Sequence, residues 1–381
     1  MKETRVIIVF ALLQLMSFSS CVYPYGLSVD EEALTPLLVV EGDIIANGIT
    51  RIQLSRTVAL KETVLSLECQ ALVYIEDEHG GRYVAKEIES GIYEAETQAL
   101  NSHLRYRLYI ELANKMSYVS EYVPVCISPP IDSVGYVVNA TKTGVDFHVS
   151  THDPLGKSRY YKWEYIEDWE INSEYYSELV FEAETGRYRS RSLEENLYYC
   201  WTKGESTVIL LGQSTRLQED VIANRKIATL WEYDQRVSVL YCMQVIQKVL
   251  TREGYTYWEN LRKNTEDMGG IFSTQASEIK GNIISLSNPD EVVLGYISAS
   301  TVSYSNRVFF PGGVLKRRTV VCGVDEIAPS DTQAGLSLAS TGMLPIKYNA
   351  FGEVEWRPGS CSDCRRYGSK KKPSWWPSNH I

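Results

Sequence analysis

Short strand-like runs separated by turn signals fill residues 36–130, and they limit the fold more than any other feature of the chain. Residues 37–41 form an apolar run, and Asn47-Gly48 suits a type I′ hairpin turn. Residues 71–77 (ALVYIED) alternate in polarity before a glycine-containing turn. Roughly seven such runs fit an immunoglobulin-like β-sandwich over residues 36–128. Pro129-Pro130 then interrupts the pattern, since paired prolines cannot continue a strand ladder.

Residues 129–381 predict a larger β-rich domain with longer loops, so the chain is expected to be mainly β. One short helix is expected after Thr251 as N-cap, with Trp258 and Leu261 on one stripe and Gly269-Gly270 beyond its end. The predicted strands cover residues 133–138, 144–150, 160–170, 178–183, 207–211, 237–249, 291–298 and 307–310.

The first 20 residues have the pattern of an export signal. Lys2 and Arg5 precede an apolar run over residues 6–18. As a helix this run would cover roughly 20 Å, which is too short for a hydrocarbon core of roughly 30 Å. Residues 1–20 are therefore predicted to be a signal peptide that is not a permanent membrane span.

Cys21 follows Phe18-Ser19-Ser20 directly, an arrangement that resembles a bacterial lipobox. In such a motif the cysteine thiol is acylated and the chain is cut before it, and several acyl chains together form a stable membrane anchor. Lipidation is thus predicted at Cys21, with residues 21–35 as the lipidated tether. The alternative is an ordinary signal peptide with a coincidental cysteine.

The acidic balance of the chain argues against a nucleic-acid partner. The formal net charge is −10, from 38 Lys and Arg against 48 Asp and Glu. Phosphate backbones are bound by positively charged surfaces. No nucleic-acid-binding function is therefore expected.

Cysteine spacing predicts disulfides near the C-terminus. Cys361 and Cys364 form a CxxC motif, but no second such motif completes a zinc site. In an oxidising compartment long-range disulfides are the better interpretation, and Cys200 and Cys322 are the favoured partners because both flank polar, turn-like segments. Sequence leaves the connectivity open.

An aromatic row lies in the predicted strand at residues 160–170, where alternate side chains share one face. Such a row suits a partner interface or a glycan or peptide ligand, because Tyr and Trp dominate binding hot spots. The competing interpretation is the core of a sandwich, since aromatic residues are also good strand formers. The same alternatives apply at the start of the predicted helix. The residues concerned are Tyr161, Trp163, Tyr165 and Trp169 in the strand, and Tyr255, Tyr257 and Trp258 in the helix.

No residue pattern in the chain indicates a reaction. His148 and His152 would share a strand face, but surface histidines are a better interpretation than a metal site because no HExxH motif is present. The sequence predicts no catalytic residues, no metal and no cofactor, and the protein is not expected to be an enzyme. A hydrolase with an unrecognised site is the weakest alternative.

Several stretches, in order along the chain, carry a resemblance to a known family. They are LVVEGDI (38–44), IQLSRT (52–57), PPIDSV (129–134), YYKWEYIEDWE (160–170), Cys200-Trp201, residues 245–283, VLGYISAS (293–300) and the CxDC tail ending in KPSWW. These stretches resemble a family of outer-membrane lipoproteins of Bacteroidota, the domain of unknown function (DUF) 4249. Such proteins are typically encoded beside importers of the starch-utilisation (SusCD) type, which pair a TonB-dependent barrel with a SusD-like lipoprotein. The resemblance brings no catalytic residues.

This resemblance implies a non-catalytic accessory or binding subunit of a TonB-dependent nutrient-uptake complex. The barrel and the SusD-like lipoprotein are its expected partners. The expected location is the outer membrane, with the lipid anchor holding the protein toward the cell exterior. The alternative function is an independent envelope lipoprotein for structure or adhesion.

Overall fold

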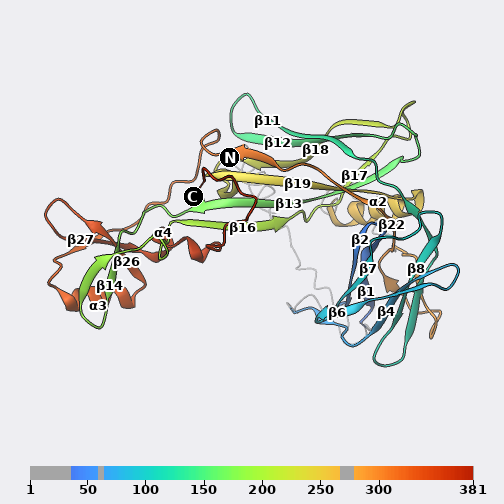
Figure 1. The fold of residues 1–381 in the computed structure, drawn as a ribbon, viewed down its shortest axis with the longest axis horizontal. Coiled ribbons are helices and arrows are strands. Elements are labelled where there is room, and N and C mark those ends of the chain that lie inside the picture. Colours follow the sequence, from blue (N-terminus) through green and yellow to red (C-terminus); the bar gives the residue numbers. More distant parts are fainter. Residues whose placement is uncertain (1–35, 59–63, 267–278, 381) are drawn as a thin grey trace, which may run out of the picture.

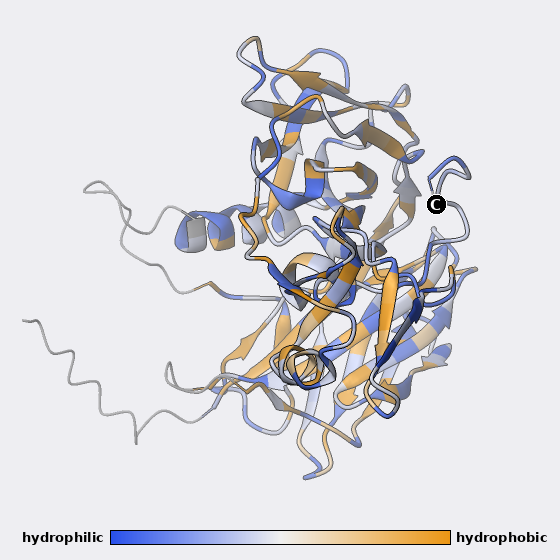
Figure 2. Ribbon diagram, turned by 90° about the vertical axis from the view of Figure 1, so that its left-hand side faces the viewer, coloured by the Kyte–Doolittle hydropathy of each residue, from blue (hydrophilic) through white to orange (hydrophobic). Residues whose placement is uncertain are grey.

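The protein is mainly β and is built in three parts along its longest axis, as the computed structural model shows (Figure 1). The structure describes residues 36–58, 64–266 and 279–380. The mainly β prediction is confirmed. In the second view, apolar and hydrophilic segments alternate along many strands (Figure 2), as expected where one strand face is buried and the other is not.

The part that begins the described chain, the first lobe, is one nearly closed sheet. Its order is β20-β9-β8-β10-β22-β1-β2-β7-β6, with β21 and β3 added beside β1 and β2, and β4 and β5 beside β8. Its strands are β1 (Leu38–Ile45), β2 (Gly48–Arg56), β3 (Ser66–Leu67), β4 (Leu72–Asp77), β5 (Arg82–Val84), β6 (Lys86–Glu89), β7 (Ile92–Thr97), β8 (Arg105–Glu111), β9 (Ser117–Ser120), β10 (Val123–Cys126), β20 (Ile283–Ser285), β21 (Val293–Leu294) and β22 (Ala299–Ser300).

Strands β20, β21 and β22 return to this lobe from far along the chain. β22 pairs in parallel with both β1 and β10, and so joins the two halves of the sheet. The predicted sandwich over residues 36–128 contains β1–β10, but its sheet also takes in these three strands, which the sequence prediction assigned to the later domain. They are only two or three residues long, and such short runs carry little periodicity.

The β1–β2 hairpin forms at the predicted place but without the predicted turn. Neither Asn47 nor Gly48 has a positive φ, so the type I′ assignment is wrong. Asn47 is instead held by a distant strand: its side chain donates to the Val302 carbonyl at 3.1 Å and accepts from the Val302 N–H at 2.9 Å. This tertiary contact overrides the local turn preference.

The middle part, the central sandwich, packs a three-stranded sheet (β11-β12-β18) on a six-stranded one (β16-β13-β19-β23, with β17 beside β13 and β24 beside β19). Phe147, Tyr241 and Met243 are among the side chains fully buried between the sheets. The strands are β11 (Ile131–Val138), β12 (Gly144–His152), β13 (Tyr160–Asn172), β16 (Tyr199–Glu205), β17 (Leu210–Gln213), β18 (Val221–Trp231), β19 (Leu240–Val249), β23 (Val302–Tyr304) and β24 (Val308–Pro311).

The predicted helix is confirmed as α2 (Arg252–Glu266), which lies between the first lobe and the central sandwich (Figure 1). The Thr251 hydroxyl accepts from the Gly254 N–H at 3.1 Å, which is the N-cap contact expected from the sequence. Gly269-Gly270, predicted to follow the helix end, lies outside the described residues. No helix in the described ranges is long and apolar enough to cross a membrane.

The part farthest from the first lobe, the distal lobe, is small and is built around Trp356. This side chain is fully buried, and its ring lies 5.5 Å from Phe181 and 6.1 Å from Tyr188. Helices α3 and α4 were not predicted, because their sequences are short and rich in Gly and Ser. The elements are β14 (Leu179–Glu182), β15 (Arg187–Ser190), β25 (Asp325–Ile327), β26 (Met343–Tyr348), β27 (Val354–Pro358), α3 (Thr332–Ser340) and α4 (Gly359–Ser362).

Candidate functional site

The aromatic row of β13 belongs to the core, which is one of the two interpretations that the sequence left open. Tyr161 and Trp163 are fully buried, with ring centroids 5.8 Å apart and nearly parallel planes. The Trp163 indole N–H donates to the Gln247 side chain at 2.9 Å. Tyr165 and Trp169 are partly buried against the same core. Alternation placed these rings on one face correctly, but it could not say that a second sheet covers that face.

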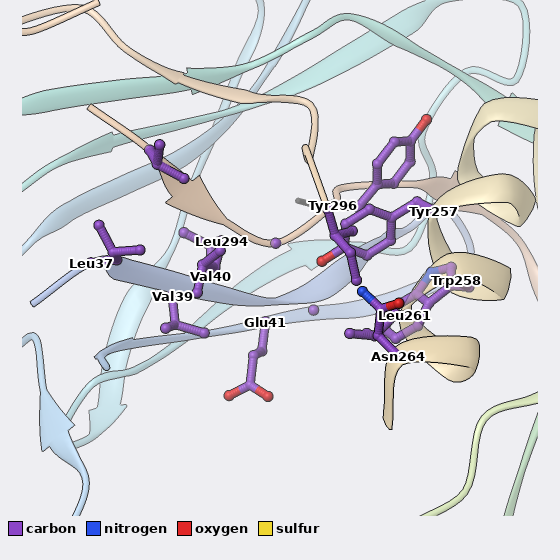
Figure 3. A pocket seen from close by; sticks show the side chains of 14 residues that line it. Leu37, Val39, Val40, Glu41, Tyr257, Trp258, Leu261, Asn264, Leu294 and Tyr296 are labelled. Carbon is purple, nitrogen blue, oxygen red and sulfur yellow. The ribbon is translucent and has the colours of Figure 1, made fainter. Parts of the chain in front are cut away.

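A cavity of about 650 Å³ lies instead between α2, β1 and the returning segment that contains β21 (Figure 3). We call it the helix cavity. Its size falls within the range of small-ligand sites, and most of its lining is apolar. Its lining residues are Leu37, Val39, Val40, Glu41, Gly42, Tyr257, Trp258, Leu261, Asn264, Ile279, Val292, Leu294, Gly295 and Tyr296.

Aromatic rings form the end of the helix cavity next to α2. Tyr257 stacks on Tyr296 with ring centroids 5.1 Å apart, and it meets Trp258 edge-on at 5.6 Å. Burial raises the pKa of both tyrosines, so their hydroxyls stay protonated at neutral pH. These groups offer flat apolar surface and polar O–H groups, and no activated nucleophile.

Glycine allows the backbones beneath the helix cavity to approach closely. Gly295 has a φ of 135°, and a Cβ built there would lie 2.1 Å from the Val40 carbonyl oxygen. Gly42 has a φ of 134°, and its Cβ would lie 2.3 Å from the Arg51 carbonyl oxygen. Only glycine fits these positions, so Gly295 lets the returning segment lie close to β1, and Gly42 lets β1 lie close to β2.

The indole of Trp258 connects the helix cavity to a network of buried charges. The Lys162 ammonium lies 3.6 Å from the centroid of the Trp258 ring and 3.0 Å from Glu164. Lys248 lies 3.2 Å from Glu164 and 2.9 Å from Asp43 of β1. The network thus joins α2, the central sheet and the first lobe. We call it the ionic junction.

The charges of the ionic junction stabilise one another. Burial alone would raise the pKa of Asp43, but the attraction of Lys248 and Lys162 outweighs it and lowers that pKa. Burial alone would lower the pKa of Lys248, and the attraction of Asp43 and Glu164 raises it instead. Asp43 and Lys248 are therefore ionised together at neutral pH, and each makes the burial of the other tolerable.

Few polar side chains line the helix cavity. Among the lining residues that the structure describes, Glu41 is the one carboxylate and Asn264 the one carboxamide. Over the ranges that the structure describes, no group of three or more His, Cys, Asp and Glu side chains has the geometry to hold a metal ion. His152, which was weighed as a metal ligand, lies 2.7 Å from Asp132.

Only part of this site could be predicted from the sequence. Tyr255, Tyr257 and Trp258 were named as aromatic residues of either a core or a binding surface, and Tyr257 and Trp258 line the helix cavity. Tyr296 and Leu294 were not predicted, because their position depends on the return of β21 to β1, about 250 residues away in sequence. The glycine in VLGYIS was the available signal, since an isolated glycine in a strand-like run marks a bulge or close backbone approach.

Comparison with known protein families decides the family. The family model described as "Domain of unknown function (DUF4249)" matches residues 23–305, which is most of the chain. The chain belongs to the DUF4249 family. The match spans the first lobe, the ionic junction and the helix cavity, and it ends before the distal strands β25–β27.

The other comparisons add little to the DUF4249 assignment. No curated protein matches this chain. Similar solved structures include the pullulanase from Anoxybacillus sp. LM18-11, with 10% identity and a TM-score of 0.16, and its complex with maltotriose, with 11% identity and a TM-score of 0.16. Each alignment covers 55% of this chain and 24% of the pullulanase chain, so the DUF4249 chain spans about a quarter of their length.

The four cysteines predicted to form disulfides in this DUF4249 chain are paired in the structure. Cys200 of β16 bonds to Cys364, and Cys322 bonds to Cys361. This agrees with the prediction and supplies the connectivity that the sequence left open. Cys21, the predicted lipidation site, lies outside the described residues, and lipidation stays a prediction.

The C-terminal tail of the DUF4249 chain lies against the central sandwich. Trp376 is buried against Phe309, and its indole N–H donates to the Glu170 carboxylate at 3.4 Å. A ring nitrogen of His380 lies 2.9 Å from the same carboxylate. The disulfide at Cys364, the packing of Trp376 on Phe309 and the two contacts to Glu170 together fix the tail to the sheet.

Proposed function

We propose that this protein is a lipid-anchored outer-membrane lipoprotein that faces the cell exterior and acts by non-covalent binding. Its role is that of an accessory subunit of a TonB-dependent nutrient importer of the SusCD type. Its partners are the importer barrel and the SusD-like lipoprotein. It carries out no reaction.

The anchor part of this proposal rests on the sequence. A short positive segment, an apolar run and small residues precede Cys21, and residues 21–35 then separate that cysteine from the first lobe. The importer part rests on the resemblance to lipoproteins typically encoded beside such importers, and the membership in DUF4249 is compatible with it.

The helix cavity is the observation that carries a binding role. It is a partly open, mostly apolar hollow with two stacked tyrosines and a tryptophan at one end. Aromatic and aliphatic side chains around a concavity are the usual anchors of protein contacts. Leu37, which directly precedes β1, lines the cavity and is separated from the predicted tether by Pro36 alone, so an anchored chain carries this cavity on its tethered lobe.

Co-purification from detergent-solubilised outer membrane tests the proposal. We expect the wild-type protein to retain the barrel and the SusD-like lipoprotein. Leu261→Gln should reduce their recovery about tenfold, because it places an amide in the apolar wall of the cavity. Leu193→Gln is the matched control, since Leu193 is 86% exposed in the distal lobe and should retain both partners.

Two outcomes would count against this function. Recovery of neither partner with the wild-type chain would favour an independent lipoprotein for envelope structure or adhesion. Equal recovery with Leu261→Gln and the wild-type chain would remove the helix cavity from the contact surface.

A further inference from the structure

A second, more polar cavity of about 460 Å³ lies where the central sandwich meets the distal lobe. We call it the junction cavity. Its walls come from the end of β13, the turn before β19, the connection after β24, α4 and the residue after the 3-10 turn Cys364–Arg366. Its lining residues are Ile171, Asn172, Ser173, Glu174, Tyr233, Gln235, Ser238, Val239, Arg317, Arg318, Val320, Ser360 and Tyr367.

Two adjacent arginines make the junction cavity a basic site in an acidic protein. Arg317 lies 3.0 Å from Glu174, which neutralises one of the two charges. Arg318 is exposed and has no ion pair within the part of the chain that the structure describes. The lining therefore carries a net positive charge although the whole chain carries a formal −10. A guanidinium presents paired N–H donors that match the two oxygens of a carboxylate.

Two half-exposed tyrosines, 52% and 49% accessible, also line the cavity. Tyr233 has a φ of 68°, a left-handed conformation that is unfavourable for a bulky side chain. Its N–H donates to the Lys316 carbonyl at 2.7 Å, which fixes the conformation beside the two arginines. Tyr367 donates to the Ser360 carbonyl at 3.1 Å, so that hydrogen bond holds its ring in place. Strained residues of this kind cluster at ligand sites.

We propose that the junction cavity binds an acidic saccharide, in which a uronate carboxylate pairs with Arg318 and the sugar rings lie against Tyr233 and Tyr367. Gln235 and the free N–H groups of Arg317 are the remaining lining donors for sugar hydroxyls. The combination of rings, amide and guanidinium fits a hydroxylated ring that carries a carboxylate. A bare inorganic anion would use the arginines and leave the tyrosines without a role. This inference deepens the proposed binding role by naming a ligand class.

Calorimetric titration of the full chain with trigalacturonate tests the inference, with neutral galactotriose as the comparison sugar. We expect saturable binding of the acidic sugar that is at least tenfold tighter than that of the neutral one. Binding should weaken with salt, since it includes an exposed ionic contact. Arg318→Gln should weaken trigalacturonate binding about tenfold. Arg216→Gln, at another exposed arginine, should leave it unchanged.

Tyr233→Gly separates ligand binding from folding. Glycine adopts a positive φ without strain, so the variant should keep the wild-type unfolding midpoint or exceed it while binding weakens about tenfold. No saturable binding of trigalacturonate, or equal binding by wild type, Arg318→Gln and Tyr233→Gly, would overturn the inference. Inorganic phosphate competing as well as the sugar would also overturn it. None of these results would alter the recovery of importer partners through the helix cavity.

Discussion

The two ends of this molecule are joined to its centre by different chemistry. The first lobe meets the central sandwich through the ionic junction, where Asp43 and Lys248 pair at 2.9 Å in a buried setting. The distal lobe meets it through the Cys200–Cys364 disulfide and through the N–H of Glu174, which donates to the Cys361 carbonyl. The first contact is ionic and the second includes a disulfide, so we expect pH to weaken the first and reduction to weaken the second.

This difference follows from the size of the two lobes. The first lobe has a large apolar core of its own and needs only a specific docking contact. The distal core centres on Trp356, Val354 and Leu179, and small cores rarely stabilise a fold without covalent support. We therefore expect ionic changes to affect one end and cysteine changes the other.

Asp43→Ala should have the largest effect. It leaves Lys248 buried without its closest partner and should lower the free energy of unfolding by about 3–5 kcal/mol. Urea denaturation measures the loss, and hydrogen exchange should locate it in β1 and β19. Glu111→Ala is the control, because Glu111 pairs with an exposed lysine and should cost at most about 1 kcal/mol. Equal losses in the two variants would refute a special role for the buried pair.

Cys200→Ala combined with Cys364→Ala should cost about 2–4 kcal/mol, because the bridge closes a long loop in the unfolded chain. Hydrogen exchange should accelerate in β25–β27 and in the C-terminal tail, while β1 and β2 keep their protection. Equal acceleration of hydrogen exchange in the first lobe and the distal lobe would contradict the independence of their contacts with the central sandwich.

Gly295→Ala should cost about 1–3 kcal/mol, since alanine is strained at a φ of 135° and its Cβ would meet the Val40 carbonyl. Thermal unfolding of the variant measures the effect, and the loss of exchange protection should centre on β21 and β22. Gly323→Ala is the control, because no atom lies within 4 Å of a Cβ built there. A Gly295→Ala variant as stable as the wild-type protein would show that β1 and the returning segment do not approach closely at the helix cavity.

Acidification should weaken the ionic junction and leave the disulfide-linked contact of the distal lobe intact. We expect its effect on stability to be smaller than those of the substitutions above. Asp43 and Glu164 have lowered pKa values in the folded protein, so their contribution is complete above the unfolded pKa of about 4 and is lost as the pH falls through the folded pKa. Lys248 has a raised pKa, so its contribution is present below about pH 10 and is lost at higher pH. The protection of β1 amides against hydrogen exchange should therefore be greatest between about pH 4 and about pH 10. If β25–β27 lost protection before β1 on acidification, the assignment of the acid-sensitive contact to the ionic junction would be contradicted.

Sequence periodicity predicted local structure well and long-range pairing poorly. Alternation identified β13, and Thr251 correctly marked the start of α2. Cys200 and Cys322 were chosen as partners of Cys361 and Cys364 because both flank polar, turn-like segments, and the structure pairs these four cysteines. Alternation could not tell that the row beginning at Tyr161 faces a second sheet.

The candidate sites depend on contacts that no local pattern contains. Asp43 and Lys248 are 205 residues apart in sequence, and each alone reads as an ordinary charged residue in a strand. The helix cavity exists because β21 returns to β1, and the junction cavity exists because the connection that contains Arg318 passes Tyr233. Such pairings are set by the tertiary fold, so sequence could indicate the aromatic residues of α2 and not the cavity they line.

Site-specific photo-crosslinking at position 261 in intact outer membranes tests the central claim most directly. A photoreactive phenylalanine in place of Leu261 should give an adduct with the importer barrel or the SusD-like lipoprotein, because Leu261 lines the helix cavity, the proposed contact surface. The same group at position 193 should give none. No adduct from position 261, or equal adducts from both positions, would contradict the account.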